Sequence, residues 1–396
     1  MATYSVKWFT SDMRGAPVVS GTAGTLIAML DACLVTGFGV VTATSVTVSG
    51  GVATATLPSS SLFLKDAVVL VAGATSLTEI NGEQRVLSGS STQVTWATAA
   101  ADGTAAGTIT IKYAPVGAWT KVYSGTNLAV YRSTDPQSNG HYLRVDDTGT
   151  TSARVRGYEE MTDVNTGTGP FCTDTQMSGG GYWWKSASAN TNASKWKLFG
   201  DSRFFGVAVA AASSSSTVNI AAPAKGFGDA LALAPGGDAW NTVLSANGNN
   251  SSNSALYGAL DNSSVSATLG FVVSPRSWTG LGSAVLLNSL PYIGATTAVS
   301  GADATLGIVP SEIDGRIKPT RRFLSEQGTN KPPRSEIPGV MSIPQTGALS
   351  ILNDGDILAG ADDLAGRQLM CVATGFSYTN APTGIYLVDI TGPWRS

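Results

Sequence analysis

Short runs in which apolar and polar residues alternate, separated by glycine-containing turns, constrain the fold of this chain more than any other feature. Residues 45–48 and 52–56 alternate on either side of Gly50 and Gly51. Alternation with a period of two puts the apolar side chains on one face of a strand, and a glycine pair accepts the positive φ angles of a two-residue hairpin turn. The pattern therefore predicts a β-hairpin at this point in the chain.

More runs of this kind follow at short spacing. They cover residues 67–72, 84–87, 93–97 and 108–113. Turn signals such as Asn81-Gly82 and Asp102-Gly103 separate them. Together with the hairpin, they predict a small all-β sandwich or barrel over residues 41–115.

A second set of alternating runs predicts an antiparallel meander over residues 116–165. The runs are residues 128–132, 141–145 and 153–158. Their connections are short, and short connections favour antiparallel neighbours.

One segment near the start has helical rather than strand periodicity. Across residues 22–37, apolar side chains recur three and four positions apart, and Gly37 stands where a helix would end. The recurring residues are Leu26, Met29, Leu30, Cys33 and Leu34. We predict an amphipathic helix that, with Trp8, Phe9 and Arg14, forms a docking segment over residues 1–40. The alternative is that this segment is only the edge of the first domain.

The second half of the chain has a region with little charge and then a highly charged one. Residues 166–310 predict a low-charge β domain with long loops, and residues 341–396 predict strands that complete it. Between them, residues 311–336 contain six basic and four acidic side chains and three prolines. We predict an exposed arm or loop over residues 311–340, with Arg321 and Arg322 as candidate contact residues.

The predicted fold is therefore mainly β, with several small antiparallel β-sandwich or barrel domains and one N-terminal amphipathic helix. Only 13 % of the residues are charged, where a soluble domain typically has about 25 %. A neutral surface protects a protein poorly against association, so this composition favours a component of a large symmetric assembly.

The charge balance and the hydropathy pattern also exclude two kinds of partner. The net charge of −3 provides no field that would hold a phosphate backbone, so we predict no nucleic-acid partner. No run approaches about 18 consecutive apolar residues, so we predict no membrane insertion.

Residues that commonly carry enzyme chemistry are rare or poorly arranged. The single histidine, His141, lies in a strand-like run, and no G-x-S-x-G motif accompanies it. Carboxylate doublets such as Glu159-Glu160 point to opposite faces of an extended chain, so they do not converge on a substrate. The three cysteines are widely spaced, which indicates buried free thiols. We predict no catalytic residue, no cofactor and no metal site.

An aromatic group offers a possible ligand contact. Tyr182, Trp183, Trp184 and Trp196 lie close together in the sequence. Flat ring faces can stack on sugars, so these residues are candidates for binding a glycan. The alternative is that they are core or interface residues.

Several segments resemble the virion structural proteins of tailed bacteriophages. They are residues 8–17, 21–26, 30–34, 125–132, 144–147, 158–164, 227–229, 338–339 and 389–394. The resemblance implies a non-enzymatic building block, made in the bacterial cytoplasm and located in the virion, at the tail, the baseplate or the head surface.

Three classes of function follow from these observations. The first is a structural protein of the tail or baseplate that assembles as a symmetric homo-oligomer and binds other virion proteins. The second is an adhesin or fibre protein that binds a host surface glycan, and a head-surface decoration protein is a further variant of the structural hypothesis. The third is a depolymerase that uses convergent carboxylates.

Overall fold

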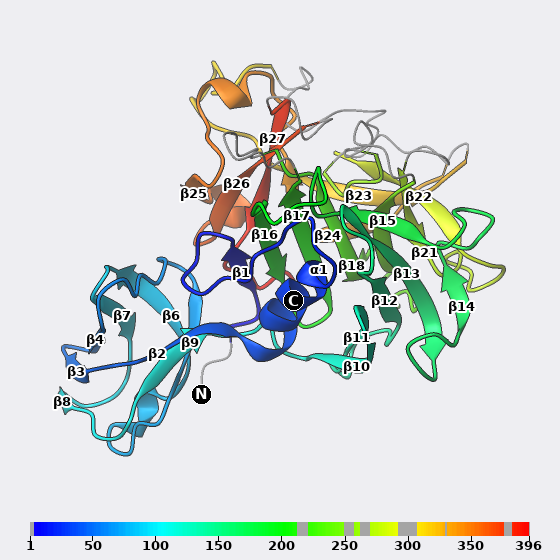
Figure 1. Cartoon of the computed structure of the whole chain (residues 1–396). Coiled ribbons are helices and arrows are strands. Elements are labelled where there is room, and N and C mark those ends of the chain that lie inside the picture. The colour runs from blue at the N-terminus through cyan, green and yellow to red at the C-terminus, as the bar shows by residue number, and fades with distance from the viewer. Residues whose placement is uncertain are drawn as a thin grey trace.

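The computed structural model describes residues 4–211, 221–248, 257–261, 270–291, 307–328, 331–375 and 382–395. Residues 1–3 of the expected docking segment and several stretches of the expected 166–310 domain lie outside these ranges. The described protein is mainly β, as predicted, and it is built from large antiparallel sheets. In Figure 1 the strands of residues 38–113 group at one end, and the later strands form a larger body.

An eight-stranded sheet contains the strands of the first half of the chain. They are β2 (Phe38–Thr42), β3 (Ser45–Ser49), β4 (Val52–Thr56), β5 (Val68–Ala72), β6 (Gly82–Gly89), β7 (Gln93–Ala97), β8 (Gly103–Thr104) and β9 (Thr110–Tyr113), with a short 3-10 helix at Thr78–Ile80. The predicted hairpin is confirmed: β3 pairs antiparallel with β4, and Gly50 and Gly51 have φ angles of 57° and 77°. The runs at 67–72, 84–87, 93–97 and 108–113 match β5, β6, β7 and β9.

The core of this sheet is apolar. Val46 and Val48 alternate with exposed neighbours on β3, as a strand with one buried face requires. Trp96 on β7 and Tyr113 on β9 are fully buried, and the Tyr113 ring lies 5.0 Å from the ring of Phe63. No charged side chain is buried between residues 38 and 113, all of which are described.

The remaining strands of the described chain are linked by hydrogen bonds into one larger network. They are β1 (Lys7–Thr10), β10 (Trp119–Gly125), β11 (Leu128–Ser133), β12 (Tyr142–Asp146), β13 (Ser152–Met161), β14 (Gly167–Phe171), β15 (Gly181–Trp184), β16 (Lys195–Gly200), β17 (Phe204–Ala210), β18 (Ala224–Asp229), β19 (Leu231–Ala232), β20 (Thr242–Asn247), β21 (Gly270–Ser274), β22 (Val285–Leu290), β23 (Thr320–Glu326), β24 (Pro333–Ser342), β25 (Ile357–Ala359), β26 (Gln368–Thr374) and β27 (Gly384–Asp389). Short 3-10 helices lie at Ala348–Ser350 and Asp362–Leu364.

The expected meander is present within this network. β11, β12 and β13 pair in sequence order, each antiparallel to the next. β13 also pairs with β15, and β15 contacts β20 through Tyr182 and Asn247. The meander is thereby joined to the strands of the second half of the chain.

The helix differs from its prediction in length and in the way it is buried. α1 spans Thr25–Leu30 and continues into a π-helical turn at Asp31–Thr36. Ile27 and Ala32 are buried as well as the predicted apolar stripe, so the segment is not clearly amphipathic. The Asp147 carboxylate accepts hydrogen bonds from the backbone N–H groups of Leu26 and Ile27. A distant loop therefore holds the start of the helix, and periodicity could not have indicated this.

Residues 311–340 were expected to form an exposed arm or loop, and much of this range instead forms strands. β23 and β24 pair antiparallel, and β24 also pairs with β19 and β27. Arg322, Glu326 and Arg334 are buried. These three charges are packed against polar partners inside the fold, and composition alone could not reveal those partners. Other charged residues of the segment, such as Glu312, Arg316 and Arg321, are exposed.

Two groups of buried apolar residues hold the described chain together. The larger includes residues of both the eight-stranded sheet and the larger network. The smaller, which includes Ile343, Leu369 and Leu387, lies among the strands at the C-terminal end. The residue boundaries of the expected domains remain predictions.

Candidate functional site

The predicted N-terminal contact residues lie mostly inside the protein. Trp8 and Phe9 are on β1, which pairs with β16, and both side chains are buried. Leu26 and Leu30 are buried on α1, and Arg14 is half-buried. The indole N–H of Trp8 donates to the Asp66 carbonyl oxygen at 3.2 Å. This burial does not support a role for Trp8, Phe9, Leu26 and Leu30 in docking a partner, because they contact the chain's own sheets.

The two neighbouring arginines of β23 point to opposite faces. Arg321 is 58 % exposed, whereas Arg322 is fully buried. The guanidinium of Arg322 donates to the Ser289 hydroxyl at 3.0 Å and to the Ser342 hydroxyl at 2.5 Å. Burial lowers the pKa of Arg322 to about 10. Of this pair, only Arg321 is available to a partner.

The candidate glycan residues do not form an exposed platform. Trp183, Trp184 and Trp196 are buried, and Arg154 lies 3.9 Å from the ring centre of the half-buried Tyr182. The indole N–H of Trp183 donates to the Ser245 carbonyl oxygen at 2.7 Å, and that of Trp196 to Pro17 at 3.0 Å. The cavity beside Trp183 and Trp184 has a volume of about 20 Å³, which is too small for a sugar ring. Their packing matches the alternative reading as core residues.

His141 belongs to a buried polar network rather than to an open site. Its Nδ1 lies 2.7 Å from the hydroxyl of Thr242, and that hydroxyl donates to Asp229 at 2.6 Å. Burial lowers the pKa of His141, although Asp229 and Glu159 act against this shift. Thr242 is itself buried, so its hydroxyl cannot reach a substrate. These contacts link the residue before β12 to the end of β18 and the start of β20.

The two carboxylates of a doublet lie in different surroundings, so they do not form a shared site. Glu160, for example, is exposed. Glu159 pairs with Arg276 through two bonds of 2.7 Å, and Asp146 lies 3.7 Å from Arg144. Asp147 forms a fully buried pair with Lys185. Burial raises the pKa of Asp147, and hydrogen bonds from Lys185 and from the start of α1 oppose this rise.

The three cysteines are free and buried. Burial raises the pKa of Cys172 and Cys371 to about 12, and it raises the pKa of Cys33 well above its ordinary value. All three therefore remain protonated thiols near neutral pH.

The strongest candidate for a functional site is a polar hollow of about 810 Å³ beside the C-terminal residues. Arg203, Arg321, Arg367 and Arg395 converge on it from four separate parts of the chain. We call it the arginine hollow. Sequence reasoning identified only Arg321 of these four, because no spacing pattern connects the others.

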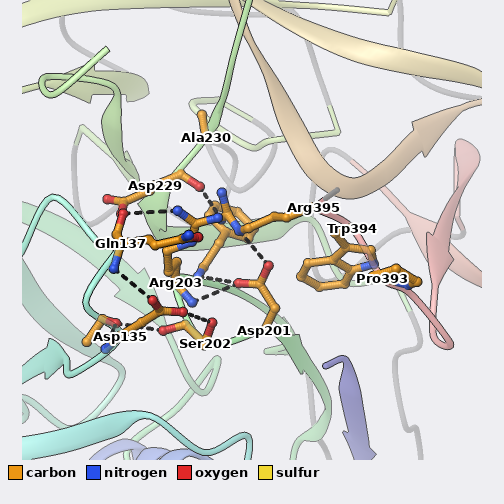
Figure 2. A network of polar contacts seen from close by, with 12 residues as sticks. Asp135, Gln137, Asp201, Ser202, Arg203, Asp229, Ala230, Pro393, Trp394 and Arg395 are labelled. Carbon is orange, nitrogen blue, oxygen red and sulfur yellow. Dashed lines mark hydrogen bonds and ion pairs between the residues drawn. The ribbon is translucent and has the colours of Figure 1, made fainter. Parts of the chain in front are cut away.

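A network of hydrogen bonds builds one wall of this hollow. The Asp201 carboxylate accepts the backbone N–H groups of Arg203 and Phe204 and so shapes the turn between β16 and β17. The same carboxylate accepts Arg395 Nε at 2.7 Å, and another nitrogen of Arg395 donates to the Asp229 carbonyl oxygen. Figure 2 shows Arg203 and Arg395 both bonded to Asp201 in this network. The C-terminal residues are thereby fixed against two distant turns.

The charges around the arginine hollow are unequally neutralised. Arg367 pairs with Asp389 at 2.7 Å, and Arg321 with Glu336 at 3.3 Å. Arg203 donates to the Gln137 carbonyl oxygen at 3.0 Å but forms no ion pair with any described residue. An arginine has five N–H donors, so Arg203 keeps donors for an incoming acceptor.

An apolar hollow of about 350 Å³ adjoins the arginine hollow, and Leu233 and Asp238 line both. Trp278, Pro332 and Pro333 also line it, and we call it the tryptophan hollow. Trp278 is 66 % exposed, and Leu233 is also exposed. Large exposed apolar side chains that gather in one place mark interaction surfaces in soluble proteins.

Polar contacts hold the Trp278 loop in place. The backbone N–H of Trp278 donates to Glu326 at 2.8 Å, and Arg334 donates to the Arg276 carbonyl oxygen at 2.8 Å. Arg334 is fixed in turn by two bonds to Asp238, of 2.6 and 3.0 Å. The indole is thus presented by a preformed loop above a buried ion network. The high charge of residues 311–336 was visible in the sequence. It pointed to the residues that hold this loop, Glu326 and Arg334, and not to the exposed ring of Trp278.

Within the described ranges, no group of three His, Cys, Asp or Glu side chains is arranged to hold a metal ion. In the same ranges, no helix is both long enough and apolar enough to span a bilayer. In comparisons with known proteins, no protein family and no curated protein matches this chain.

Proposed function

We propose that this chain is a non-enzymatic structural protein of a tailed-bacteriophage virion, located in the tail or baseplate. It assembles as a symmetric homo-oligomer and joins other virion proteins. The observation that carries the proposal is the hollow beside the arginine hollow that the exposed apolar side chains of Leu233 and Trp278 line. Such a surface gains free energy when a partner covers it, at roughly 25 cal/mol for each Å² of apolar area removed from water.

The burial of the reactive side chains supports a structural role. His141, the three cysteines and the Asp147–Lys185 pair are buried within the chain. The resemblance of residues 8–17 and 389–394 to virion proteins supports the same role. Both segments lie in the packed body of the structure, where β1 pairs with β16 and the Trp394 indole donates to Asp389.

The finer architecture belongs to the same proposal. The chain consists of several small antiparallel β-sandwich or barrel domains, and the helix near its start stabilises the junction between them. The Lys7–Glu83 ion pair of 2.8 Å supports such a junction, because it links β1 of the larger network to β6 of the eight-stranded sheet.

The test is to find the chain in virions. Virions of the phage that encodes it are purified, analysed by mass spectrometry and imaged by cryo-electron microscopy. The proposal expects many copies per virion, with density for this fold in a symmetric ring on the tail. Absence from virions that are otherwise complete would refute it, and density on the capsid would identify a head-surface decoration protein instead.

A glycan-binding adhesin or fibre protein is the second candidate, and the polar lining of the arginine hollow favours it. Gln137, Asn139 and Arg203 offer hydrogen-bonding groups of the kind that bind sugar hydroxyl and carboxylate groups. A glycan array probed with the wild-type chain and with Arg203→Ala separates the candidates. Binding that is lost in the variant supports the adhesin, whereas no binding to any host surface glycan argues against it.

A further inference from the structure

One turn of the chain presents an apolar side chain between two acidic ones. Ile313 is 95 % exposed, the highest value among the large apolar side chains of the described residues. Glu312 and Asp314 flank it, and both are exposed as well. A partner that covered this side chain would gain free energy by removing its apolar surface from water.

The turn is held in a fixed shape by its own backbone. Gly315 N–H donates to the Ser311 carbonyl oxygen at 2.7 Å, and Ser311 N–H to the Arg316 carbonyl oxygen at 2.9 Å. Gly315 has a φ of 68°, a conformation that glycine adopts without strain. A preformed knob binds with a smaller entropy cost than a flexible segment.

The charges of the turn complement those of the arginine hollow. Asp314 pairs with Lys318 in the same turn, whereas Glu312 forms no ion pair with any described residue. In the arginine hollow, the Arg203 guanidinium likewise forms no ion pair with a described residue, although its charge helps to lower the pKa of Asp135. The knob thus offers an unpaired carboxylate next to an apolar side chain, and the hollows offer an unpaired guanidinium next to an apolar surface.

We propose that the turn at residues 311–315 of one copy docks into the paired hollows of a second copy. Ile313 enters the tryptophan hollow against Trp278, and Glu312 pairs with Arg203. This contact rests on the proposed function and identifies the surfaces of its homo-oligomer. Because the knob and the hollows are different surfaces, the interface is heterologous, and repeated copies close into a ring or extend as a filament.

Complementation between two variants tests the contact. Ile313→Ser removes the knob and Trp278→Ser removes the apolar wall. Leu62→Ser, at another exposed apolar residue in the connection between β4 and β5, is the matched control. All three side chains are exposed, so the thermal unfolding midpoints should equal that of the wild type. Sedimentation velocity at increasing protein concentration then measures assembly.

We expect the wild type and Leu62→Ser to form closed rings or larger species, and each of the other variants to associate at least tenfold more weakly. An equimolar mixture of Ile313→Ser and Trp278→Ser should form a one-to-one dimer and stop there. That mixture has one intact knob and one intact pair of hollows per two chains. Glu312→Gln should weaken assembly less and reduce its dependence on salt concentration.

Two results would overturn the contact. One is a wild type that stays monomeric at every concentration, and the other is assembly of Ile313→Ser or Trp278→Ser at the wild-type affinity. Neither result decides the proposed function, which depends on the presence of the chain in virions. Absence from virions together with successful complementation would instead leave the contact standing and refute the virion role.

Discussion

The eight-stranded sheet and the larger strand network differ in the kind of side chain that they bury. Between residues 38 and 113 no charged side chain is buried, and the core consists of residues such as Val46, Trp96 and Tyr113. The larger network buries charged residues on many of its strands and in its turns. Those of its described part are Lys7, Asp147, Lys185, Lys197, Asp201, Lys225, Asp229, Asp261, Arg322, Glu326, Arg334 and Asp389.

The difference shows which forces hold each part. Apolar burial is non-directional and depends on the area removed from water. The eight-stranded sheet should therefore tolerate substitutions that preserve side-chain volume. Buried charges need particular partners, and a lost partner leaves an uncompensated charge in a medium of low dielectric. The larger network should therefore respond to single polar substitutions and to pH, whereas the core of the small sheet should not.

The largest expected effect is at Arg322. Arg322→Ala removes a fully buried guanidinium and leaves the hydroxyls of Ser289 and Ser342 without their donor. We expect a loss of about 3–5 kcal/mol in the free energy of unfolding, because the substitution also removes the buried positive charge that acts on the buried Asp261. Urea denaturation measures it, with Arg321→Ala as the matched control on the opposite face of β23. The control should cost less than about 1 kcal/mol.

Equal losses from the two substitutions would contradict the burial of Arg322 and the strand assignment of β23 together. A loss confined to Arg321→Ala would mean that the two faces of the strand are exchanged. Either result would also remove the contrast between the two regions.

This pair of arginines illustrates how far the sequence could predict the structure. Strands with local signals, such as the hairpin at Gly50 and Gly51, were predictable because alternation and turn residues lie within a few positions of each other. The partners of buried charges lie far away in sequence: Arg334 binds Asp238, and Arg395 binds Asp201. No local pattern encodes such pairs, so the charged segment 311–340 was predicted to be exposed.

The candidate site was less predictable than the fold for the same reason. The arginine hollow needs four side chains from four segments, and only Arg321 stood out in the sequence. Trp278 lies in a low-charge region whose composition gives no sign of an exposed ring. Trp183 and Trp196, which were predicted as candidate glycan-binding residues, are packed inside the chain. Composition indicates that rings are present but does not show whether they face the core or the solvent.

The second prediction concerns Lys225 on β18. Burial lowers its pKa from 10.5 to about 7, and the charge of Asp261 only partly offsets this. The unfolded chain therefore binds more protons than the folded chain between pH 7 and 10.5, so this lysine makes stability rise with pH across that window. The contribution is at most about 1.4 kcal/mol per pH unit. The free energy of unfolding at pH 7 and at pH 9 measures it.

Lys225→Met is the variant that isolates this effect. It keeps most of the side-chain volume and cannot titrate, so the increase from pH 7 to 9 should be smaller in the variant than in the wild type. Identical pH dependence in the two proteins would show that Lys225 titrates normally and is not buried. Trp96→Phe, in the apolar core of the small sheet, should retain the wild-type pH dependence.

A smaller pH effect is expected from His141. Burial depresses its pKa below the ordinary value of 6.5, so the unfolded chain binds the proton more readily. Stability from this group is complete above about pH 6.5 and is lost as the pH falls below that value. In His141→Gln the decline between pH 6.5 and 5 should be shallower than in the wild type when both are followed by urea denaturation. A steeper decline in the variant would mean that His141 is stabilised in its charged form.

The smallest expected effect concerns the backbone of the turn between β3 and β4 in the eight-stranded sheet. Gly50 has a φ of 57°, and a Cβ added there would meet no atom within 4 Å, so Gly50→Ala adds strain without a clash. The left-handed conformation should cost alanine about 1 kcal/mol, and the hydrogen bond from the residue 50 N–H to Asp102 is kept.

Gly236→Ala is the matched control, because a Cβ there also meets nothing and the φ of Gly236 is not in the left-handed region. A thermal midpoint that falls in Gly50→Ala, stays unchanged in Gly236→Ala and is largely restored in Gly50→Asn would show that the hairpin turn alone sets this cost. If Gly50→Asn were as unstable as Gly50→Ala, the left-handed turn would not be its cause.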